Sequence, residues 1–280
     1  EAEDYFRRAV SISARIPLAY YFLGIMSKER GEMQTAIDML RKALELNPDA
    51  EIIYRDLSHA HFLAGDLENA RSAALQGIEH NPDFPEFHLI LGNLNYYEQQ
   101  PVQAAQSYRA ALSLLPDASA YLNLGRIYAE QGDANEAINC YQKALELNPN
   151  NPDIFYNFGS ILISSHKNEA IACFRNVLAL QPGNLAALSK LIHLQMQQCS
   201  WDDLLPQVDQ MHRELAKASS SNASQPTPFE FLSLPGTTAA EQKRCAEMWT
   251  QQEYQPISAL RRKQNFRFQR NASGKITLGY

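Results

Sequence analysis

Apolar residues recur at helical spacing along the first two thirds of the chain, and short polar turns separate one apolar segment from the next. Residues 1–10 already have the pattern of a helix interior, because Ala2, Phe6 and Val10 fall on one face. The same kind of segment returns many times between residues 17 and 184. The pattern therefore predicts a succession of amphipathic helices.

Three kinds of landmark residue repeat with one period along these segments. Prolines follow the apolar helices at a spacing of 33 or 34 residues: Pro48, Pro82, Pro116, Pro149 and Pro182. Alanines stand 12 residues before each proline: Ala36, Ala70, Ala104, Ala137 and Ala170. Small residues stand 11 or 12 residues before each alanine: Gly24, Ser58, Gly92, Gly125 and Gly159. Three series with one period predict a repeat architecture in which each unit is a pair of antiparallel helices.

The landmark residues have direct physical roles in such a helix pair. Gly24 and Ala36, with their equivalents, are expected where the two helices approach most closely, because larger side chains would push the axes apart. Each proline ends a unit, since it cannot continue a helix. Gly31, Gly65 and Gly132 are expected in the turn between paired helices.

The unit over residues 118–151 has the most complete pattern. It contains Tyr121-x-x-Leu124-Gly125-x-x-Tyr128, followed by Ala137, Tyr141, Ala144 and Pro149. These residues resemble the tetratricopeptide repeat. The resemblance implies an all-α fold, a tetratricopeptide-repeat right-handed superhelix (α-solenoid) whose first helices line a concave groove. The expected organisation is a half repeat over 1–16, five repeats over 17–184, a capping helix pair over 185–217, a linker and helix over 218–273, and a short strand over 274–280.

The repeat register also indicates which residues would face the groove. One row holds Phe22, Asp56, Ile90, Asn123 and Asn157, and its neighbour holds Ile25, His59, Asn93, Arg126 and Ser160. An uncharged amide offers donors and an acceptor to a peptide backbone regardless of the peptide's sequence, and tyrosines add flat contact area. The candidate peptide-binding residues are Asn93, Asn123, Asn157, Arg126, Tyr96, Tyr97 and Tyr156. The alternative interpretation is that these are solvated polar positions on helices.

The period ends after residue 184, and the last third of the chain has a different pattern. A leucine-rich helix is expected over 185–198, followed by Cys199-Ser200-Trp201-Asp202 and an amphipathic helix to about residue 217. A hydrophobic loop is expected over 228–234, a helix over about 238–252 and a turn and strand over 274–280. This order resembles the junction before the catalytic region in the protein O-linked N-acetylglucosamine transferase family. The residues that carry the resemblance are Cys199, Trp201 and Asp202, together with residues 228–234 and 275–280.

That resemblance implies a function for a longer protein from which this sequence would be cut. Family members transfer a sugar, usually N-acetylglucosamine from UDP-N-acetylglucosamine, to Ser or Thr hydroxyls of intracellular proteins. It implies that this chain binds acceptor proteins or peptides, while catalytic residues would follow Tyr280. No catalytic residue and no cofactor are expected here, and a UDP-sugar donor is implied for the full-length protein. The alternative is a non-enzymatic tetratricopeptide-repeat adaptor or scaffold, which the repeats alone equally permit.

Composition and charge narrow the classes of partner. The 280-residue chain carries a net charge of −6, so neither nucleic acid nor a membrane surface is an expected partner. A basic stretch over 261–275 with interleaved Phe266 and Phe268 is interpreted as a contact with an acidic part of its own protein, with nucleic acid as the alternative. Four widely spaced cysteines form no disulfide framework, which indicates a cytoplasmic protein. A metal site is not expected, and homo-oligomerisation is left open.

Overall fold

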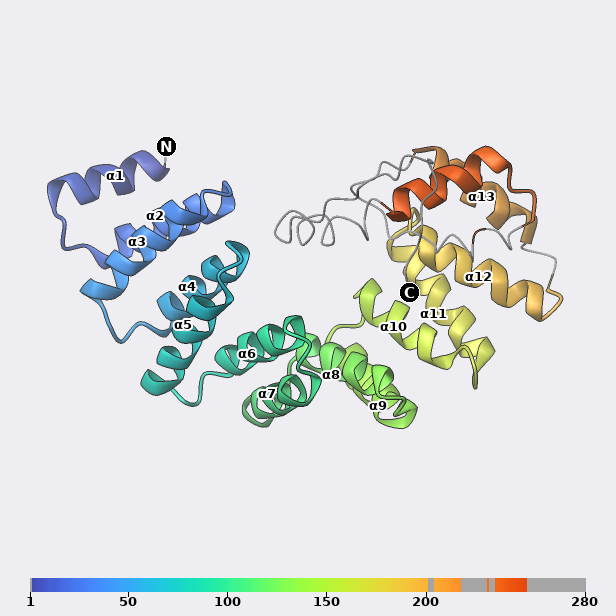
Figure 1. Cartoon of the computed structure of the whole chain (residues 1–280), viewed down its shortest axis with the longest axis horizontal. Helices are drawn as coiled ribbons and strands as arrows, with labels where there is room; N and C mark the ends of the chain where they lie inside the picture. Colours follow the sequence, from blue (N-terminus) through green and yellow to red (C-terminus); the bar gives the residue numbers. More distant parts are fainter. Residues whose placement is uncertain (1, 201–203, 218–230, 232–234, 251–280) are drawn as a thin grey trace, which may run out of the picture. The chain divides into compact units, whose positions relative to one another are not determined.

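The computed structural model describes residues 2–200, 204–217, 231 and 235–250, and every regular element within these residues is a helix (Figure 1). The labelled helices are α1 (Ala2–Ile12), α2 (Pro17–Glu29), α3 (Met33–Leu46), α4 (Glu51–Leu63), α5 (Leu67–His80), α6 (Pro85–Tyr97), α7 (Pro101–Leu114), α8 (Ala118–Glu130), α9 (Ala134–Leu147), α10 (Pro152–Leu162), α11 (Lys167–Leu180), α12 (Leu185–Gln197) and α13 (Leu204–Lys217). A further helical segment covers residues 239–250.

This arrangement confirms the predicted all-helical solenoid of tetratricopeptide-repeat type. The chain divides into two compact units, Glu1–Ile161 and Leu162–Tyr280. The predicted strand over 274–280 and the basic stretch over 261–275 lie outside the described residues. The predicted domain boundaries and the right-handed superhelix stay predictions.

Many of the labelled helices begin at a start signal that the sequence supplies. Proline occupies the first position of α2, α6, α7 and α10, where its missing N–H would have had no partner in the helix. At α5, α8, α9 and α12 a side-chain oxygen caps the first turn; for example, Asp117 accepts from Ala120 N at 2.8 Å and Asn184 accepts from Ala187 N at 2.9 Å. These local signals place the helix ends at the predicted period.

The turns inside the pairs confirm the predicted glycines and add two residues with side chains that were not predicted. Gly31, Gly65 and Gly132 have φ values of 80°, 78° and 81°, in the left-handed region that glycine enters without a steric penalty. At the equivalent turns the residue is Gln99 between α6 and α7, with φ of 61°, and Cys199 between α12 and α13, with φ of 54°. A side chain in this conformation costs about 1–2 kcal/mol, so these two turns are locally strained.

Four of the small landmark residues, Gly24, Ser58, Gly92 and Gly125, lie at close approaches of paired helices, as predicted. A Cβ atom on Gly24 would stand 2.8 Å from Leu40 Cγ, and one on Gly125 would stand 2.7 Å from Tyr141 Cε1. At Ser58 the same position is filled by a buried hydroxyl that donates to Ala70 O at 2.6 Å. Each pair therefore uses a small residue to let a large side chain from its partner helix pack against the backbone.

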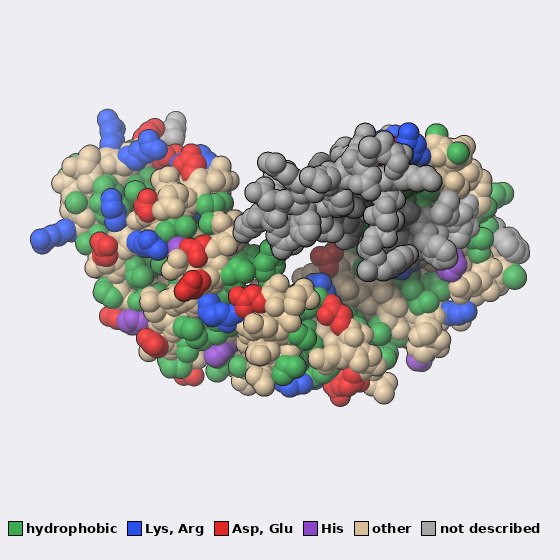
Figure 2. All heavy atoms as spheres, viewed as in Figure 1, with side chains coloured by type: hydrophobic (Ala, Val, Ile, Leu, Met, Phe, Trp, Pro, Cys, Tyr) green, Lys and Arg blue, Asp and Glu red, His purple; other side chains and the backbone are tan. Residues whose placement is uncertain are grey.

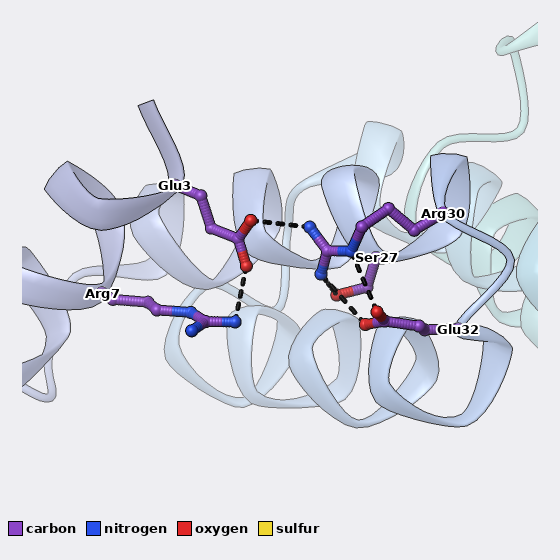
Figure 3. Close-up of polar contacts among 5 residues, drawn as sticks. All are labelled: Glu3, Arg7, Ser27, Arg30 and Glu32. Atoms are coloured by element: carbon purple, nitrogen blue, oxygen red, sulfur yellow. Dashed lines mark hydrogen bonds and ion pairs between the residues drawn. The ribbon is translucent and has the colours of Figure 1, made fainter. Parts of the chain in front are cut away.

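A network of charged side chains fixes α1 against the turn between α2 and α3 (Figure 3). Glu3 accepts from Arg7 at 2.6 Å and from Arg30 at 2.7 Å. Arg30 also forms two 3.0 Å bonds to Glu32 and one of 3.2 Å to Ser27. Exposed pairs of this kind contribute little individually, so their main effect is to select the orientation of α1.

The second unit has a separate apolar core. It is built from α12, α13, Phe231 and the helix over 239–250, whose Cys245 and Met248 are buried. Thr238 and Glu241 cap this helix reciprocally, with Thr238 N donating to Glu241 Oε2 at 2.8 Å and Glu241 N donating to Thr238 Oγ1 at 3.3 Å. Glu241 also contacts His212 of α13 at 2.6 Å, which links the two helices.

Candidate functional site

The first helices of successive pairs lie side by side in the first unit. α4 contacts both α2 and α6 directly, and hydrogen bonds join α6 to α8 (Figure 1). We call the surface formed by α2, α4, α6 and α8 the first-helix face. The groove rows of the predicted register lie on these helices and on α10. On the view of the first unit in Figure 2, acidic and basic side chains are interspersed over the surface.

Two of the predicted asparagines meet on this face. Asn123 Nδ2 of α8 donates to Asn93 Oδ1 of α6 at 3.2 Å, and the buried Tyr108 hydroxyl donates to the same oxygen at 2.7 Å. Burial raises the pKa of Tyr108, so the hydroxyl stays protonated and remains a donor. Within the described residues, the Asn93 amide hydrogens and the Asn123 side-chain carbonyl form no hydrogen bond. A peptide backbone offers one acceptor and one donor that could pair with these groups.

Arg126 and Tyr96 form a second contact between α8 and α6. The Arg126 guanidinium lies 5.0 Å from the centroid of the Tyr96 ring and donates to its hydroxyl at 3.1 Å. The hydroxyl donates in turn to Glu130 Oε1. Burial and the bond to Glu130 raise the pKa of Tyr96. Two predicted residues are therefore already engaged with each other, and their role is to hold α6 against α8.

The other predicted residues lie apart from this pair. Asn157 Nδ2 donates to Asp153 O within α10 at 2.7 Å, so its amide is engaged by its own helix. Tyr156 is half-buried on the same helix. Tyr97 is 63% exposed at the end of α6 and meets Phe62 edge-on, with ring centroids 5.7 Å apart. The structure thus joins Asn93 with Asn123 and Tyr96 with Arg126, and it adds Phe62 beside Tyr97.

Asp56 interrupts the asparagine row, and the structure gives the reason. The residue is 6% exposed, and its carboxylate accepts at 2.9 Å from Tyr21, from Lys28 and from Arg55. Burial opposes ionisation, but the bonds and charges of Lys28 and Arg55 outweigh it and lower the pKa of Asp56. Burial and the bond to Asp56 raise the pKa of Tyr21 to about 12. Asp56 therefore binds α4 to α2.

A cavity of about 310 Å³ opens between α4 and α6. Its apolar wall is formed by Phe62, Leu89, Ile90 and Leu94, and its polar wall by Arg55, Asp56, His59, Glu86 and Asn93. Asp56, His59, Ile90 and Asn93 belong to the predicted groove rows, whereas Phe62 and Glu86 do not. Both occur at helical spacing from those rows, since Phe62 follows His59 by three residues and Glu86 precedes Ile90 by four.

A buried histidine lies under the first-helix face, at the position that Tyr128 occupies in α8. His61 is 4% exposed, with Nδ1 at 3.1 Å from Asp66 Oδ2 and Nε2 at 3.4 Å from Arg41. Burial and the nearby Arg41 lower the pKa of His61, although Asp66 acts in the opposite direction. The imidazole is therefore neutral at pH 7.

We expect the first unit to lose stability as the pH falls below about 6.5, the pKa of an unfolded-state histidine. The native pKa of His61 lies below that value, so the unfolded state takes up the proton first and stability decreases with acidification. His59, whose pKa is lowered by burial and by Lys28, acts in the same direction.

The measurement is urea unfolding at a series of pH values between about 5 and 7.5. His61→Asn should flatten the slope of unfolding free energy against pH, because asparagine does not titrate. The matched control is Gln197→Asn at an exposed position of α12, which removes no titratable group and should keep the wild-type slope. Equal slopes for the wild type and His61→Asn would contradict the assignment.

The described residues offer little support for metal or thiol chemistry. No group of three or more His, Cys, Asp or Glu within them could hold a metal ion. Cys140 and Cys173 are buried, and burial raises the pKa of each thiol to about 11, which makes them poor nucleophiles. No helix in the described part of the chain is long and apolar enough to cross a bilayer.

Comparison with known proteins identifies the repeats. Profiles described as "Tetratricopeptide repeat" and "TPR repeat" match residues 28–94 and 125–163. The BBSome complex member bbs-4 of Caenorhabditis elegans is 25% identical over 154 residues, which are 52% of this chain and 33% of that protein. The chain thus spans about a third of the length of the curated relatives it matches.

Solved structures with little sequence identity share the fold. PilF of Pseudomonas aeruginosa superposes with a TM-score of 0.62 at 19% identity, covering 87% of this chain and 97% of that one. YrrB, a tetratricopeptide-repeat protein with an unusual peptide-binding site, has a TM-score of 0.50 at 21% identity, covering 65% of this chain and 95% of that one. The matched profiles and the paired-helix geometry together establish that this chain contains tetratricopeptide repeats.

Proposed function

We propose that this chain is a protein-interaction module whose first-helix face binds an extended segment of a partner protein. The observation that carries the proposal is the pairing of Asn93 with Asn123, which within the described residues leaves the Asn93 amide hydrogens and the Asn123 carbonyl available to a peptide backbone. The cavity between α4 and α6 adjoins Asn93 and adds apolar contact area. The description of YrrB as a peptide-binding protein of the same fold also supports it.

The test uses the whole chain and a peptide enriched from a random-peptide display library. Asn93→Ala combined with Asn123→Ala should weaken binding of the enriched peptide by about tenfold, since each lost hydrogen bond is worth about 0.5–1.5 kcal/mol. The thermal midpoint should also fall, because the buried Tyr108 hydroxyl loses Asn93 Oδ1 as its acceptor, so the affinity is measured well below that midpoint. Fluorescence anisotropy measures the affinity.

The matched control removes two exposed asparagines from a second helix. Asn135→Ala with Asn139→Ala on α9 deletes the same chemical groups away from the first-helix face and should leave the affinity unchanged. Failure of the library to enrich any peptide, or equal affinities for the two double variants, would contradict the proposal.

The finer assignment, substrate recognition for an intracellular O-glycosyltransferase, stays a prediction. Trp201, Asp202 and the segment over 275–280, which carry that resemblance, lie outside the described residues. None of the relatives named above is described as a glycosyltransferase. The repeats and their relatives therefore support the adaptor or scaffold alternative better, and the proposed peptide binding is common to both.

A further inference from the structure

The cavity between α4 and α6 has a size that limits its occupant. At about 310 Å³ it stands at the lower end of the range for small-molecule sites, roughly 300–1,000 Å³. Phe62, Leu89 and Ile90 give it an apolar wall, and Asn93 stands at the same cavity with its amide hydrogens unengaged within the described residues. One bulky side chain fits this volume while its own backbone remains beside Asn93.

The two carboxylates of the polar wall differ in their partners. Asp56 accepts three hydrogen bonds, including those from Lys28 and Arg55. Glu86, by contrast, forms no ion pair within the described part of the chain, and its Oε2 is buried without a hydrogen-bond partner. A buried acceptor left without a donor is unfavourable by about 1–3 kcal/mol. Glu86 is therefore the group in the cavity that a ligand can complement.

Of the two cations that pair with Asp56, Arg55 lines the same cavity as Glu86 and Lys28 does not. Lys28 belongs to α2, which contacts α4, and Glu86 belongs to α6 on the other side of α4 (Figure 1). Arg55 is engaged by Asp56. A cation beside Glu86 is thus next to a carboxylate that has no ion-pair partner within the described residues. Helix α4 lies between that cation and Lys28.

We propose that the cavity receives a bulky apolar side chain of the partner segment, and that a lysine or arginine next to this anchor pairs with Glu86. This inference rests on the proposed function and adds the class of peptide: an apolar anchor with an adjacent basic residue. The backbone of the same segment lies beside Asn93. Burial of the anchor supplies affinity, and the ion pair supplies selection between basic and acidic neighbours.

The first experiment sequences the enriched peptides and changes them one residue at a time. The peptides should share an apolar residue with a neighbouring Lys or Arg. Replacing the anchor with glycine should weaken binding roughly tenfold or more, and replacing the basic residue with glutamine should weaken it about twofold to fivefold. These changes are made in the ligand, so they leave the folding of the chain untouched.

The second experiment changes the cavity. Ile90→Trp fills it and should weaken binding roughly tenfold or more, whereas Gln103→Trp, at an exposed position of α7, should not. Glu86→Lys should reverse the charge preference, so that a peptide with glutamate in place of its basic residue binds this variant better than the wild type. Glu146→Lys on α9 makes the same charge change at an exposed position and should leave the preference unaltered.

The outcomes separate this inference from the proposed function. The inference is overturned if binding depends on Asn93 and Asn123 but is unchanged by replacement of the peptide anchor, by Ile90→Trp and by Glu86→Lys. The proposed function is retained in that case. Enriched peptides with acidic neighbours would also overturn it. If sedimentation shows a dimer that dissociates in the Ile90→Trp variant, the cavity is assigned to a second copy of this chain instead. Failure to enrich any peptide would overturn both.

Discussion

Replacing Phe87 with alanine is expected to lower the free energy of unfolding by about 3–5 kcal/mol, the usual range for deleting a fully buried phenylalanine. Phe87, near the start of α6, is 0% exposed. Its ring lies against Gly77 of α5, where an added Cβ atom would come within 2.2 Å of the ring, and 5.0 Å from the ring of Phe84. Alanine would leave a cavity between the second and third helix pairs that rigid helices cannot close.

The size of the effect reflects the side-chain volumes at positions 77 and 87, where a glycine faces a phenylalanine. At two of the equivalent junctions the pair is Ala43 with Ile53 and Ala144 with Ile154, so one residue is larger than glycine and the other is smaller than phenylalanine. Gly77→Ala alone should destabilise by about 1–3 kcal/mol, because the methyl group strikes the ring of Phe87. Gly77→Ala with Phe87→Ile should recover most of that loss, since it recreates the combination found elsewhere in the chain.

Chemical denaturation followed by far-UV circular dichroism measures these changes, and hydrogen exchange in α5 and α6 localises them. Gly183→Ala is the control, because a Cβ atom there meets only a Glu214 carboxylate oxygen at 3.4 Å, and it should not destabilise. A double variant whose loss equals the sum of the two single losses would show that Gly77 and Phe87 are not coupled.

Much of the fold could be predicted because the landmarks reflect requirements of the backbone. Gly24 and Gly125 are needed where helices nearly touch, and Gly65 is needed where φ is positive. Such requirements leave a periodic mark on the sequence. The turn at Gln99 escaped prediction because a residue with a side chain adopts the left-handed conformation there at a cost in energy.

The candidate site was less predictable, because its properties depend on pairs of residues from different helices. The repeat register placed Asn123 and Arg126 on one face, but it could not indicate that Asn123 pairs with Asn93 or that Arg126 covers Tyr96. It likewise could not indicate that Asp56 would be neutralised by Lys28, 28 residues earlier in the sequence. These contacts depend on the distance between neighbouring helices, which the side chains beneath them determine.

Removal of the Asp56 carboxylate is the second change for which we expect a large effect. Asp56→Ala should lower the free energy of unfolding by about 2–4 kcal/mol, somewhat below the usual loss for breaking a buried ion pair. The expected loss is smaller than usual because water can partly hydrate the two cations, since the side chains of Lys28 and Arg55 are 15% and 34% exposed. The penalty arises mainly because the Lys28 ammonium loses its counter-charge in a largely buried position.

The contribution of the Lys28 charge to stability can be measured in the Asp56→Ala variant. Lys28→Met should destabilise the wild-type chain but should stabilise Asp56→Ala, because methionine removes the uncompensated charge and keeps a similar apolar volume. The opposite signs are the expected signature of an ion pair between α2 and α4. Lys28→Met lowering stability equally in both backgrounds would indicate that only the packing of its aliphatic chain matters.

The same carboxylate gives the first unit an acid sensitivity of definite sign. Burial opposes ionisation of Asp56, but Lys28 and Arg55 hold its pKa below the usual value. Its stabilising contribution is therefore complete above about pH 4, near the pKa of an unfolded aspartate, and is lost as the pH falls further. Asp56→Asn should remove that part of the acid-induced loss, so its stability should vary less with pH below about 4 than that of the wild type. If both proteins lose stability at the same rate in that range, the cluster around Asp56 does not hold α2 against α4 through its charge.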